Sequence, residues 1–431
     1  MFATVIAAIT TLLTLAGFGF YILAIWSARA FLRRRRFPAG FAPGVSILKP
    51  LRGVDPGMYE AFASHCRQQY AGEYEMLFGV SSLDDPAVEL VRRLEQEFPE
   101  RSIRLLLCTE VLGPNGKVSN LAQLVPQARY DYLIINDSDI RVGPQYLARV
   151  MAPFGDSADP RLPNEGRHGA PRPGAPGLST DRPVGLVTSL YRGRAHGTLG
   201  SKLEALGLAT DFAPAVLTAL KLEKGLHFGL GSTLAVSREA LNAIGGMLTL
   251  VEYIADDYQL GVHVYRAGYR VELCDEVVET SVPAYSFREF VEHQLRWMRT
   301  VRDSRPAGYF GSVCSNLLAW AALNMVACGG SLPSIALFSL ALLFRVSLAL
   351  GVGVGILGDP QVIRDLWLIL PRDLLALALW AWSYASDTVM WRGEEFVVRK
   401  GRLVRRTPES AEVRARSHVS KNGDMGHPDN C

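Results

Sequence analysis

The chain of 431 residues lacks an excess of charge of either sign. Its 45 lysine and arginine residues nearly balance its 42 aspartate and glutamate residues, which leaves a formal net charge of +3. A protein that binds nucleic acid through bulk charge needs a basic surplus, so no nucleic-acid partner is expected. Hydrophobic residues reach 49% of the chain. Disorder as the main state is therefore excluded, because disordered chains are poor in large apolar residues.

The sequence also has few cysteines and no pattern among them. The six cysteines stand at positions 66, 108, 274, 314, 328 and 431. No two of them have the CxxC spacing that zinc sites and redox motifs use. We therefore expect neither a structural zinc site nor a disulfide framework. A reducing compartment is expected for the soluble part of the chain.

Charge is completely missing from two long stretches. Residues 3–26 carry no charged side chain, and Arg29 and the arginines at 33–36 follow at once. A helix of about 20 apolar residues crosses a bilayer core, whereas a cleaved signal peptide carries its basic residues before the apolar core. Residues 1–28 are therefore predicted to be an uncleaved transmembrane anchor. The basic cluster is expected on the cytoplasmic side.

The second apolar region, 306–390, is predicted to return to the membrane. Residues 306–344 carry no charge and a proline at 333 divides them, which favours two antiparallel spans at about 308–330 and 333–357. Arg345 would be an intramembrane charge, and such a charge usually faces protein or water rather than lipid. Residues 363–386 are interrupted at 371–373 and are predicted to form an interfacial or re-entrant helix pair. Residues 391–431 are predicted to be a basic cytoplasmic tail.

Residues 29–305 between these regions predict one soluble α/β domain. Apolar runs that are typical of strands (VSILKPL, YEMLFGV, IRLLLC, then YDYLIIN and VGLVTSLY) alternate with helix-like stretches such as PGMYEAFASHCRQQ and PAVELVRRLEQEF. This order predicts a mostly parallel sheet wrapped by helices. Residues 155–183 lack apolar periodicity and are predicted to be a flexible surface insertion. Ligands of such sheets bind at the carboxyl ends of the strands.

Acidic residues follow two of the predicted strands. Asp137 and Asp139 can face one small volume, because alternate residues of an extended chain point the same way. Such a pair suits Mg²⁺ shared with phosphate oxygens, although an ordinary strand-end turn also favours Asp and Ser. Asp84 and Asp85 precede Pro86. They can cap the helix that begins there, bind a ligand, or do both.

Two further motifs lie later in the domain. Asp256 and Asp257 stand within an otherwise apolar stretch that leads into a helix, and a carboxylate in such a place can have the raised pKa of a general base. The basic and aromatic segment around His293, Arg296 and Trp297 precedes the membrane region. Such a segment usually lies at the bilayer surface, and Arg296 can bind a phosphate there as well.

Together these motifs resemble the inverting membrane glycosyltransferases of family 2 and, more closely, of family 21, the ceramide glucosyltransferases. The similar stretches are VSILKPLRGVDP, DDPA, KVSNL, NDSDIRV, YIADDY, RW and MWRGEEF. The stretches LVTSLYRGR at 186–194 and HQLRWMRTVR at 293–302 resemble the bacterial hopanoid-biosynthesis glycosyltransferases more closely still. The resemblance implies a glycosyltransferase A-type domain with transmembrane helices at both ends. It also implies a multi-pass protein of a bacterial inner membrane with a cytoplasmic catalytic domain.

The resemblance implies a role for each motif. Asp85 would contact the uridine of a UDP-sugar, Asp137 would bind its diphosphate region, and Asp139 with Asp137 would hold Mg²⁺ or Mn²⁺. Asp257 would be the catalytic base that deprotonates the hydroxyl of a membrane-lipid acceptor. Arg296 and Trp297 would close over the diphosphate and the acceptor at the membrane surface, and Lys117 and His293 would also bind the nucleotide-sugar. The chain departs from the ceramide enzymes at Ser82, where they have Asp, and at His293, where they have Gln or Arg.

Two classes of function follow from this reading. The first is transfer of a sugar from UDP-N-acetylglucosamine or UDP-glucose to a hopanoid polyol or to ceramide. The second is a polysaccharide synthase-like channel or a non-catalytic scaffold with the same fold. A channel usually needs more than the three predicted spans, and a scaffold would be expected to lose some of its acidic positions. The first class is therefore favoured.

Overall fold

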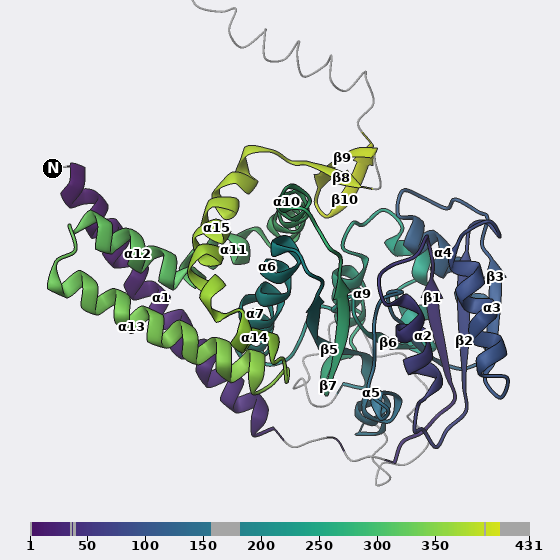
Figure 1. The fold of residues 1–431 in the computed structure, drawn as a ribbon. Coiled ribbons are helices and arrows are strands. Elements are labelled where there is room, and N and C mark those ends of the chain that lie inside the picture. The colour runs from purple at the N-terminus through teal and green to yellow at the C-terminus, as the bar shows by residue number, and fades with distance from the viewer. Residues whose placement is uncertain (1, 35–36, 38–39, 157–181, 392–393, 406–431) are drawn as a thin grey trace, which may run out of the picture.

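The computed structural model describes residues 2–34, 37, 40–156, 182–391 and 394–405. Most of the predicted insertion 155–183 and the end of the predicted tail, beyond residue 405, lie outside these ranges. The described residues form a sheet domain and a group of apolar helices that extends from one side of it (Figure 1).

A seven-stranded sheet with the order β3-β2-β1-β4-β6-β5-β7 forms the centre of the domain (Figure 1). The parallel neighbours are β1 with β2 and β4, β2 with β3, and β5 with β7, while β6 is antiparallel to β4 and β5. The predicted mostly parallel sheet is confirmed, and all five predicted strands are present. The bounds are β1 Val45–Pro50, β2 Tyr74–Val80, β3 Ser102–Leu107, β4 Tyr132–Ile135, β5 Val184–Ala195, β6 Leu234–Ser237 and β7 Arg270–Val282.

Helices cover the sheet, which explains why its inner strands are continuous apolar runs. In β1, for example, five of six residues are buried. Helix α4 packs on β1 and β2, and helices α5 and α9 pack on β5 and β7. The helices of this domain are α2 Met58–Cys66, α3 Ala87–Glu97, α4 Gly116–Leu124, α5 Tyr146–Asp156, α6 Leu199–Gly207, α7 Ala213–Leu222, α8 Arg238–Ala243, α9 Asp256–Arg266 and α10 Phe287–Ser304.

The strand order creates one position at the edge of the sheet where a ligand can bind. From β1 the chain continues to β2 on one side of it, and β4 lies on its other side. The loops that leave β1 and β4 therefore separate, and such a switch point is where open α/β sheets bind ligands. The loops after β2 and β4 carry Asp84 and Asp85 and Asp137 and Asp139, the acidic residues that the sequence indicated.

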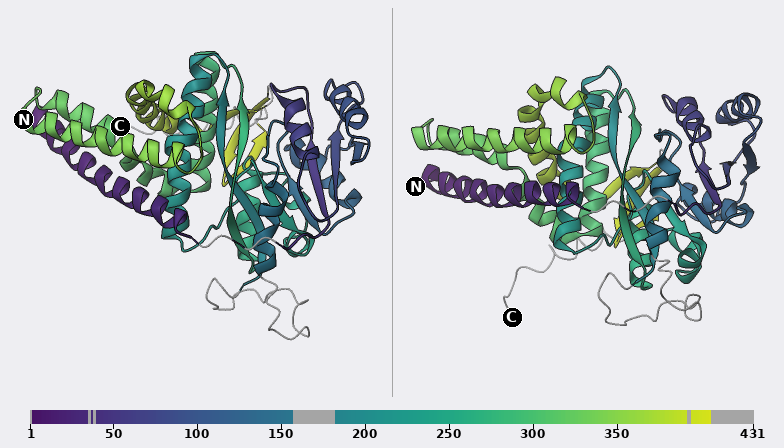
Figure 2. Two further views of the ribbon diagram at one scale, coloured as in Figure 1. Left: turned by 60° about the horizontal axis from the view of Figure 1, so that its bottom comes forward. Right: turned by 90° about the horizontal axis from the view of Figure 1, so that it is seen from below.

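A group of mostly apolar helices lies outside this domain: α1 Phe2–Leu32, α11 Pro306–Gly311, α12 Leu317–Ala327, α13 Leu332–Leu348, α14 Gln361–Arg364 and α15 Ile369–Trp382. Helices α1, α12 and α13 lie side by side and project from the sheet domain (Figure 2). By length and composition, four helices could cross a membrane: Ala3–Leu32, Leu199–Leu222, Leu332–Val354 and Leu366–Ala385. The bent pair Pro306–Ser315 and Leu317–Ala327 could form a fifth span.

One of these helices differs from the sequence-based expectation, and another lies inside the predicted soluble domain. Residues 366–385 form one helix rather than the predicted helix pair. Pro371 does not break α15 because it lies in the first turn, where backbone N–H groups have no intrahelical acceptor. Leu199–Leu222 is apolar, yet 72% of its most apolar window is buried inside the protein. It contains the π-helical turn Leu208–Phe212 between α6 and α7.

The first part of the predicted basic tail is folded. Three short antiparallel strands, β8 Thr388–Trp391, β9 Glu394–Arg399 and β10 Arg402–Arg405, form a second sheet. Its apolar side chains pack with Ile254 in a small core of their own, separate from the main core. The backbone N–H of Leu403 donates to the carbonyl of Glu252 over 2.8 Å. This sheet therefore supports the loop that leads to Asp256 and Asp257.

Candidate active site

The segment after β4 presents Asp137 and Asp139 at the carboxyl edge of the sheet. Asp139 accepts hydrogen bonds from the Thr280 hydroxyl and from the backbone N–H of Ser281 (3.0 Å), both in β7. Burial, and then the nearby Asp137 carboxylate, raise the pKa of Asp139 to about 6. Asp137 is more open, with 44% of its side chain exposed. The predicted pair therefore consists of one anchored and one accessible carboxylate.

Lys117 lies between carboxylates from two distant parts of the chain. Asn115 caps α4 by accepting from the backbone N–H groups of Lys117 and Val118, which directs the lysine into the site. Its Nζ lies 2.6 Å from Asp137 Oδ1 and 3.6 Å from Asp256 Oδ2. Burial alone would lower the pKa of Lys117, but these carboxylates raise it overall. Lys117 therefore remains a cation beside Asp137.

The adjacent residues Asp256 and Asp257 have different surroundings. Asp256 is buried and accepts from the Asn115 side-chain amide over 3.2 Å, in addition to its ion pair with Lys117. Within the described part of the chain, no Lys, Arg or His lies within ion-pair distance of Asp257. Burial, followed by the charge of Asp256, raises the pKa of Asp257 to about 6. Asp256 is thus held by an amide and a lysine, whereas the carboxylate of Asp257 has a raised pKa.

Asp85 lies at the end of β2 and ties two loops together. Its carboxylate accepts from the backbone N–H of Gly53 (2.9 and 3.1 Å) and from that of Ala87 (2.9 Å) at the start of α3. Gly53 has φ +69°, a conformation that favours glycine. The capping role that the sequence left open is therefore present. The same loop continues to Asp55, which accepts from the Ser138 hydroxyl over 2.7 Å. Asp85 is thereby connected to the Asp137–Asp139 segment.

The segment of α10 with His293, Arg296 and Trp297 lies against the buried helix α6. His293 Nδ1 is 3.0 Å from Glu204 Oε2. Because the carboxylate accepts, Nδ1 carries the proton, and Nε2 is left to face other partners. The ring of Trp297 lies 6.3 Å from that of Phe212, centroid to centroid. Burial lowers the pKa of Arg296 while Tyr285 and Glu204 oppose this effect.

Tyr191 connects the two groups of predicted residues, and the sequence did not single it out. It is buried on β5, and its ring lies 5.1 Å from that of Phe212. Burial raises its pKa well above the ordinary value, and the carboxylates of Asp257, Glu204, Asp137 and Asp139 act in the same direction. The phenol therefore stays neutral. The site thus brings Asp137, Asp139, Lys117 and Asp257 together with the α10 segment.

Lys49 is a second residue that the sequence analysis missed. It is fully buried within β1, and its Nζ donates to the backbone carbonyl of Asp137 over 3.2 Å. Burial lowers its pKa to about 7, although Asp139 and Asp137 oppose that shift. The sequence could have identified Lys49, because a lysine is unusual inside a strand that is otherwise apolar. The hydrogen bond from Lys49 holds the backbone of the segment after β4.

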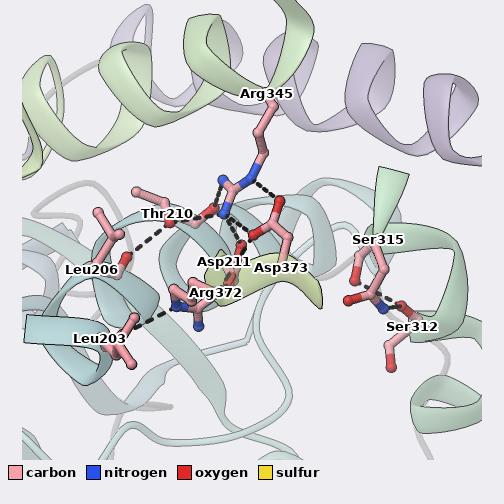
Figure 3. Close-up of polar contacts among 10 residues, drawn as sticks. Leu203, Leu206, Thr210, Asp211, Ser312, Ser315, Arg345, Arg372 and Asp373 are labelled. Carbon is pink, nitrogen blue, oxygen red and sulfur yellow. Dashed lines mark hydrogen bonds and ion pairs between the residues drawn. The ribbon is translucent and has the colours of Figure 1, made fainter. Parts of the chain in front are cut away.

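A cluster of four charges holds the helix that carries Glu204 and Phe212 (Figure 3). Arg345 of α13 is fully buried within the protein. This agrees with the expectation that its charge faces protein or water rather than lipid. Arg345 donates to both carboxylate oxygens of Asp373 (2.7 and 2.8 Å) and to Asp211 (2.8 Å). It also donates to the Thr210 carbonyl over 2.9 Å. Arg372 contacts the other oxygen of Asp211.

This cluster joins α13 and α15 to the π-helical turn between α6 and α7. Asp211 and Glu204 are isolated acids in an apolar helix, and that was the signal that could have identified them. The turn is adjacent to Phe212, which packs against Trp297 and Tyr191. The apolar helices therefore determine where part of the candidate site lies.

A divalent cation would suit the donors at this edge. Within the described ranges, no group of three or more His, Cys, Asp or Glu side chains is arranged to hold a metal ion. Mg²⁺, however, is usually held by one or two carboxylates together with substrate phosphates. Burial, and then repulsion from Asp137, raise the pKa of Asp139, and a cation would relieve the repulsion. The two aspartates therefore fit a metal that a diphosphate completes.

The chain is similar to several known proteins. Ceramide glucosyltransferase 3 of Caenorhabditis elegans is 25% identical over 298 residues, which cover 68% of this chain and 59% of that protein. Ceramide glucosyltransferase 1 of the same organism is 23% identical over 411 residues, 93% of this chain and 81% of that protein. Among solved structures, the mannosyltransferase PcManGT of Pyrobaculum calidifontis, in complex with GDP-Man and Mn²⁺, has a TM-score of 0.47 at 19% identity. That alignment covers 87% of this chain and 98% of the mannosyltransferase.

The model of the family described as glycosyl transferase family 21 matches residues 9–159 and 177–404. This match covers most of the chain, including every residue of the candidate site. It confirms the resemblance to family 21 and the α/β glycosyltransferase A-type fold that the resemblance implied. The chain belongs to glycosyl transferase family 21.

Proposed function

We propose that the protein transfers a sugar, with inversion, from a UDP-sugar to a hydroxyl group of a membrane lipid. The observation that carries this proposal is the arrangement of Asp137, Asp139, Lys117 and Asp257 around one edge of the sheet. The domain that holds them packs against helices apolar enough to cross a membrane. Such a site can bind an anionic donor and meet an acceptor that remains in the bilayer.

In this proposal, Asp257 takes the proton of the acceptor hydroxyl. The acceptor oxygen then forms a bond to the anomeric carbon, and the bond from that carbon to the diphosphate breaks. UDP leaves with the electron pair. A base with a pKa of about 6 is largely ionised at neutral pH, as general-base catalysis requires.

The remaining residues bind the donor. Asp85 is assigned to the uridine end, and Lys117 and Asp137 to the diphosphate region. Trp297, Arg296 and His293 are assigned to closure of the site over the donor. A preorganised cation beside the leaving group stabilises the negative charge that develops there.

Asp139 and Asp137 would hold Mg²⁺ or Mn²⁺, which would neutralise charge on the diphosphate when bound. Turnover should therefore be lost in excess chelator and return when Mg²⁺ or Mn²⁺ is added back. A radioactive UDP-sugar transfer assay with the purified protein measures this. Full activity in excess chelator would show that the reaction is metal-independent.

The acceptor belongs to one of two lipid classes. The names of the relatives support ceramide as acceptor and glucose as sugar. The motifs at 186–194 and 293–302 favour a hopanoid polyol with N-acetylglucosamine. Lipids extracted from cells with and without the gene should differ by one glycolipid, and its mass identifies both the sugar and the lipid. A missing polysaccharide, or no missing product at all, would instead favour the synthase-like or scaffold alternative.

We further propose that the catalytic domain faces the cytoplasm of a bacterium, with the protein crossing the inner membrane several times. The support is the basic cluster that directly follows α1. A periplasmic reporter fused after residue 36 should be inactive. Activity of that fusion would place the domain on the opposite side.

A further inference from the structure

A groove separate from the candidate active site lies at the end of α1. It has a volume of about 370 Å³ and is enclosed by the last turns of α1, the end of α7 and the start of β7. Strand β7 begins at Arg270 and runs in the same direction as β4. The groove therefore lies near the amino edge of the sheet, opposite the edge that carries Asp137 and Asp139.

One wall of the groove is apolar and belongs to the helices. Ala30 and Phe31 contribute from α1, and Leu217 and Leu220 contribute from α7. The two helices pack directly on each other, so this wall continues from the surface of the apolar helices. A hydrocarbon chain that lies along α1 could extend into the groove without crossing a polar surface.

The rest of the lining is strongly cationic. Arg34, Lys221, Lys224 and Arg270 line the groove, and Glu272 is its one acidic side chain. Glu272 is already neutralised, because Arg270 lies 3.1 Å and Arg34 3.9 Å from its carboxylate. Lys221 and Lys224 are exposed, and neither forms an ion pair with any residue that the structure describes. The two lysines are therefore available to an anionic ligand.

An aromatic residue indicates where the groove lies relative to the membrane. Trp26 of α1 is 54% exposed, and Lys221 Nζ lies 4.4 Å from the centroid of its ring. Tryptophan is enriched at the membrane–water interface, and Arg29, Arg33 and Arg34 follow within two turns. The groove is thus level with lipid headgroups on the side where the basic cluster lies.

We propose that this groove binds one anionic phospholipid, with its phosphate between Lys221 and Lys224 and the start of an acyl chain along Ala30 and Leu217. The proposal rests on the membrane placement of α1 proposed above. Basic pockets beside transmembrane helices recognise anionic headgroups in this way. The apolar wall requires a lipid, because a soluble anion such as free phosphate would leave that wall exposed.

Native mass spectrometry of the purified full chain in a neutral detergent tests the proposal. The wild type should retain one phosphatidylglycerol molecule in preference to phosphatidylcholine. The double variant Lys221→Gln/Lys224→Gln should bind phosphatidylglycerol roughly 30-fold more weakly, since each basic residue contributes about a factor of five. The matched control Arg92→Gln/Arg93→Gln removes the same charge from exposed positions on α3 and should bind as the wild type does.

A second variant tests the apolar wall without a change in charge. Ala30→Trp fills the groove and should also abolish retention of phosphatidylglycerol, whereas millimolar inorganic phosphate should not displace the lipid from the wild type. Equal retention of the two lipids by the wild type would overturn the proposal. Wild-type affinity in Lys221→Gln/Lys224→Gln, or complete displacement by phosphate, would do the same.

The readout is independent of sugar transfer. The lysine variant should keep wild-type transferase activity in neutral detergent, because the groove lies at the opposite edge of the sheet. Failure of the wild type to transfer sugar would contradict the proposed function and leave the lipid measurement valid. Failure to retain phosphatidylglycerol would contradict only the groove.

Discussion

At the scale of single residues, neighbouring carboxylates in the candidate site differ in their hydrogen-bond and ion-pair partners. Asp256 is buried against Asn115 and Lys117, whereas Asp257 has no such cation beside it. A carboxylate that is held by an ion pair is a poor base, because the cation stabilises its ionised form. Asp137 and Asp139 also differ: Asp139 is anchored to β7 by hydrogen bonds, whereas the more exposed Asp137 pairs with Lys117.

The first prediction concerns the proposed base. Asp257→Asn keeps the shape of the side chain and removes the proton acceptor, so kcat should fall by roughly 10²–10⁴-fold. Binding of UDP, measured by calorimetry, should be nearly unchanged because other groups hold the nucleotide. Asp256→Asn is the matched control: it loses the ion pair with Lys117 and should lower thermal stability more than turnover. The opposite result for the two variants would shift the base to Asp256.

The second prediction is the pH dependence of turnover. Burial raises the pKa of Asp257 to about 6, and a base works only when it is ionised. Activity should therefore be constant above pH 7 and fall about tenfold per pH unit well below the pKa. A profile of kcat/KM between pH 4.5 and 8 measures this, and the residual activity of Asp257→Asn should lack the acidic limb. If the activity of this variant still falls at acidic pH, the decline would come from protonation of another group, such as Asp139.

At the scale of elements, the C-terminal sheet β8–β10 supports the loop before the candidate base. Its core is small and separate from the main one. A unit of this kind can open locally while the rest of the protein stays folded. The hydrogen bond from Leu403 to Glu252 and the one from the Ile254 N–H to the Gly401 carbonyl (3.1 Å) then break together.

The third prediction follows from that arrangement. Leu403→Ala removes a buried side chain and should weaken the docking of the sheet by about 2–5 kcal/mol. Hydrogen exchange should increase in 388–405 and in 252–256 but not in β1, and kcat should fall. Val404→Ala, at the adjacent exposed position, should change neither quantity, since surface substitutions usually stay within about 0.5 kcal/mol. Uniformly faster exchange in Leu403→Ala would show that the sheet is not an independent unit.

At the scale of the whole molecule, the apolar helices and the sheet domain meet at the charge cluster of Arg345, Arg372, Asp211 and Asp373 (Figure 3). A buried ion pair is weak evidence for stability, but removal of one partner is costly because the other charge remains buried. The cluster also determines the position of Phe212 beside Trp297. The cluster therefore links the apolar helices α13 and α15 to the candidate active site.

The fourth prediction tests this link. Arg345→Met leaves Asp373 and Asp211 with Arg372 alone and should destabilise the protein by about 3–5 kcal/mol. The apparent melting temperature in detergent should fall, and transfer activity should be lost at temperatures where the protein is still folded. Arg288→Met breaks the exposed pair with Glu292 on α10 and should cost less than about 1 kcal/mol. Equal melting temperatures for Arg345→Met and the wild type would disprove the structural role of the cluster.

Local patterns were enough to predict much of this protein. The strands of the parallel sheet are continuous apolar runs, the uncharged stretches predict apolar helices, and the acidic motifs follow directly after strands. Each of these signals lies within about ten to twenty consecutive residues. The seven motifs in their order were also sufficient to indicate the family, which the family model confirms.

Only the tertiary structure decided how distant residues meet. Asn115 and Asp256 are 141 positions apart, and Arg345 and Thr210 are 135 positions apart. A local pattern contains no information on such pairs, because packing of whole elements brings them together. The sequence placed Asp256 and Asp257 side by side, but the cation beside Asp256 and the partial burial of Asp257 arise from the fold. The same holds for residues 394–405, whose basic composition resembles a tail until their apolar side chains pack with Ile254.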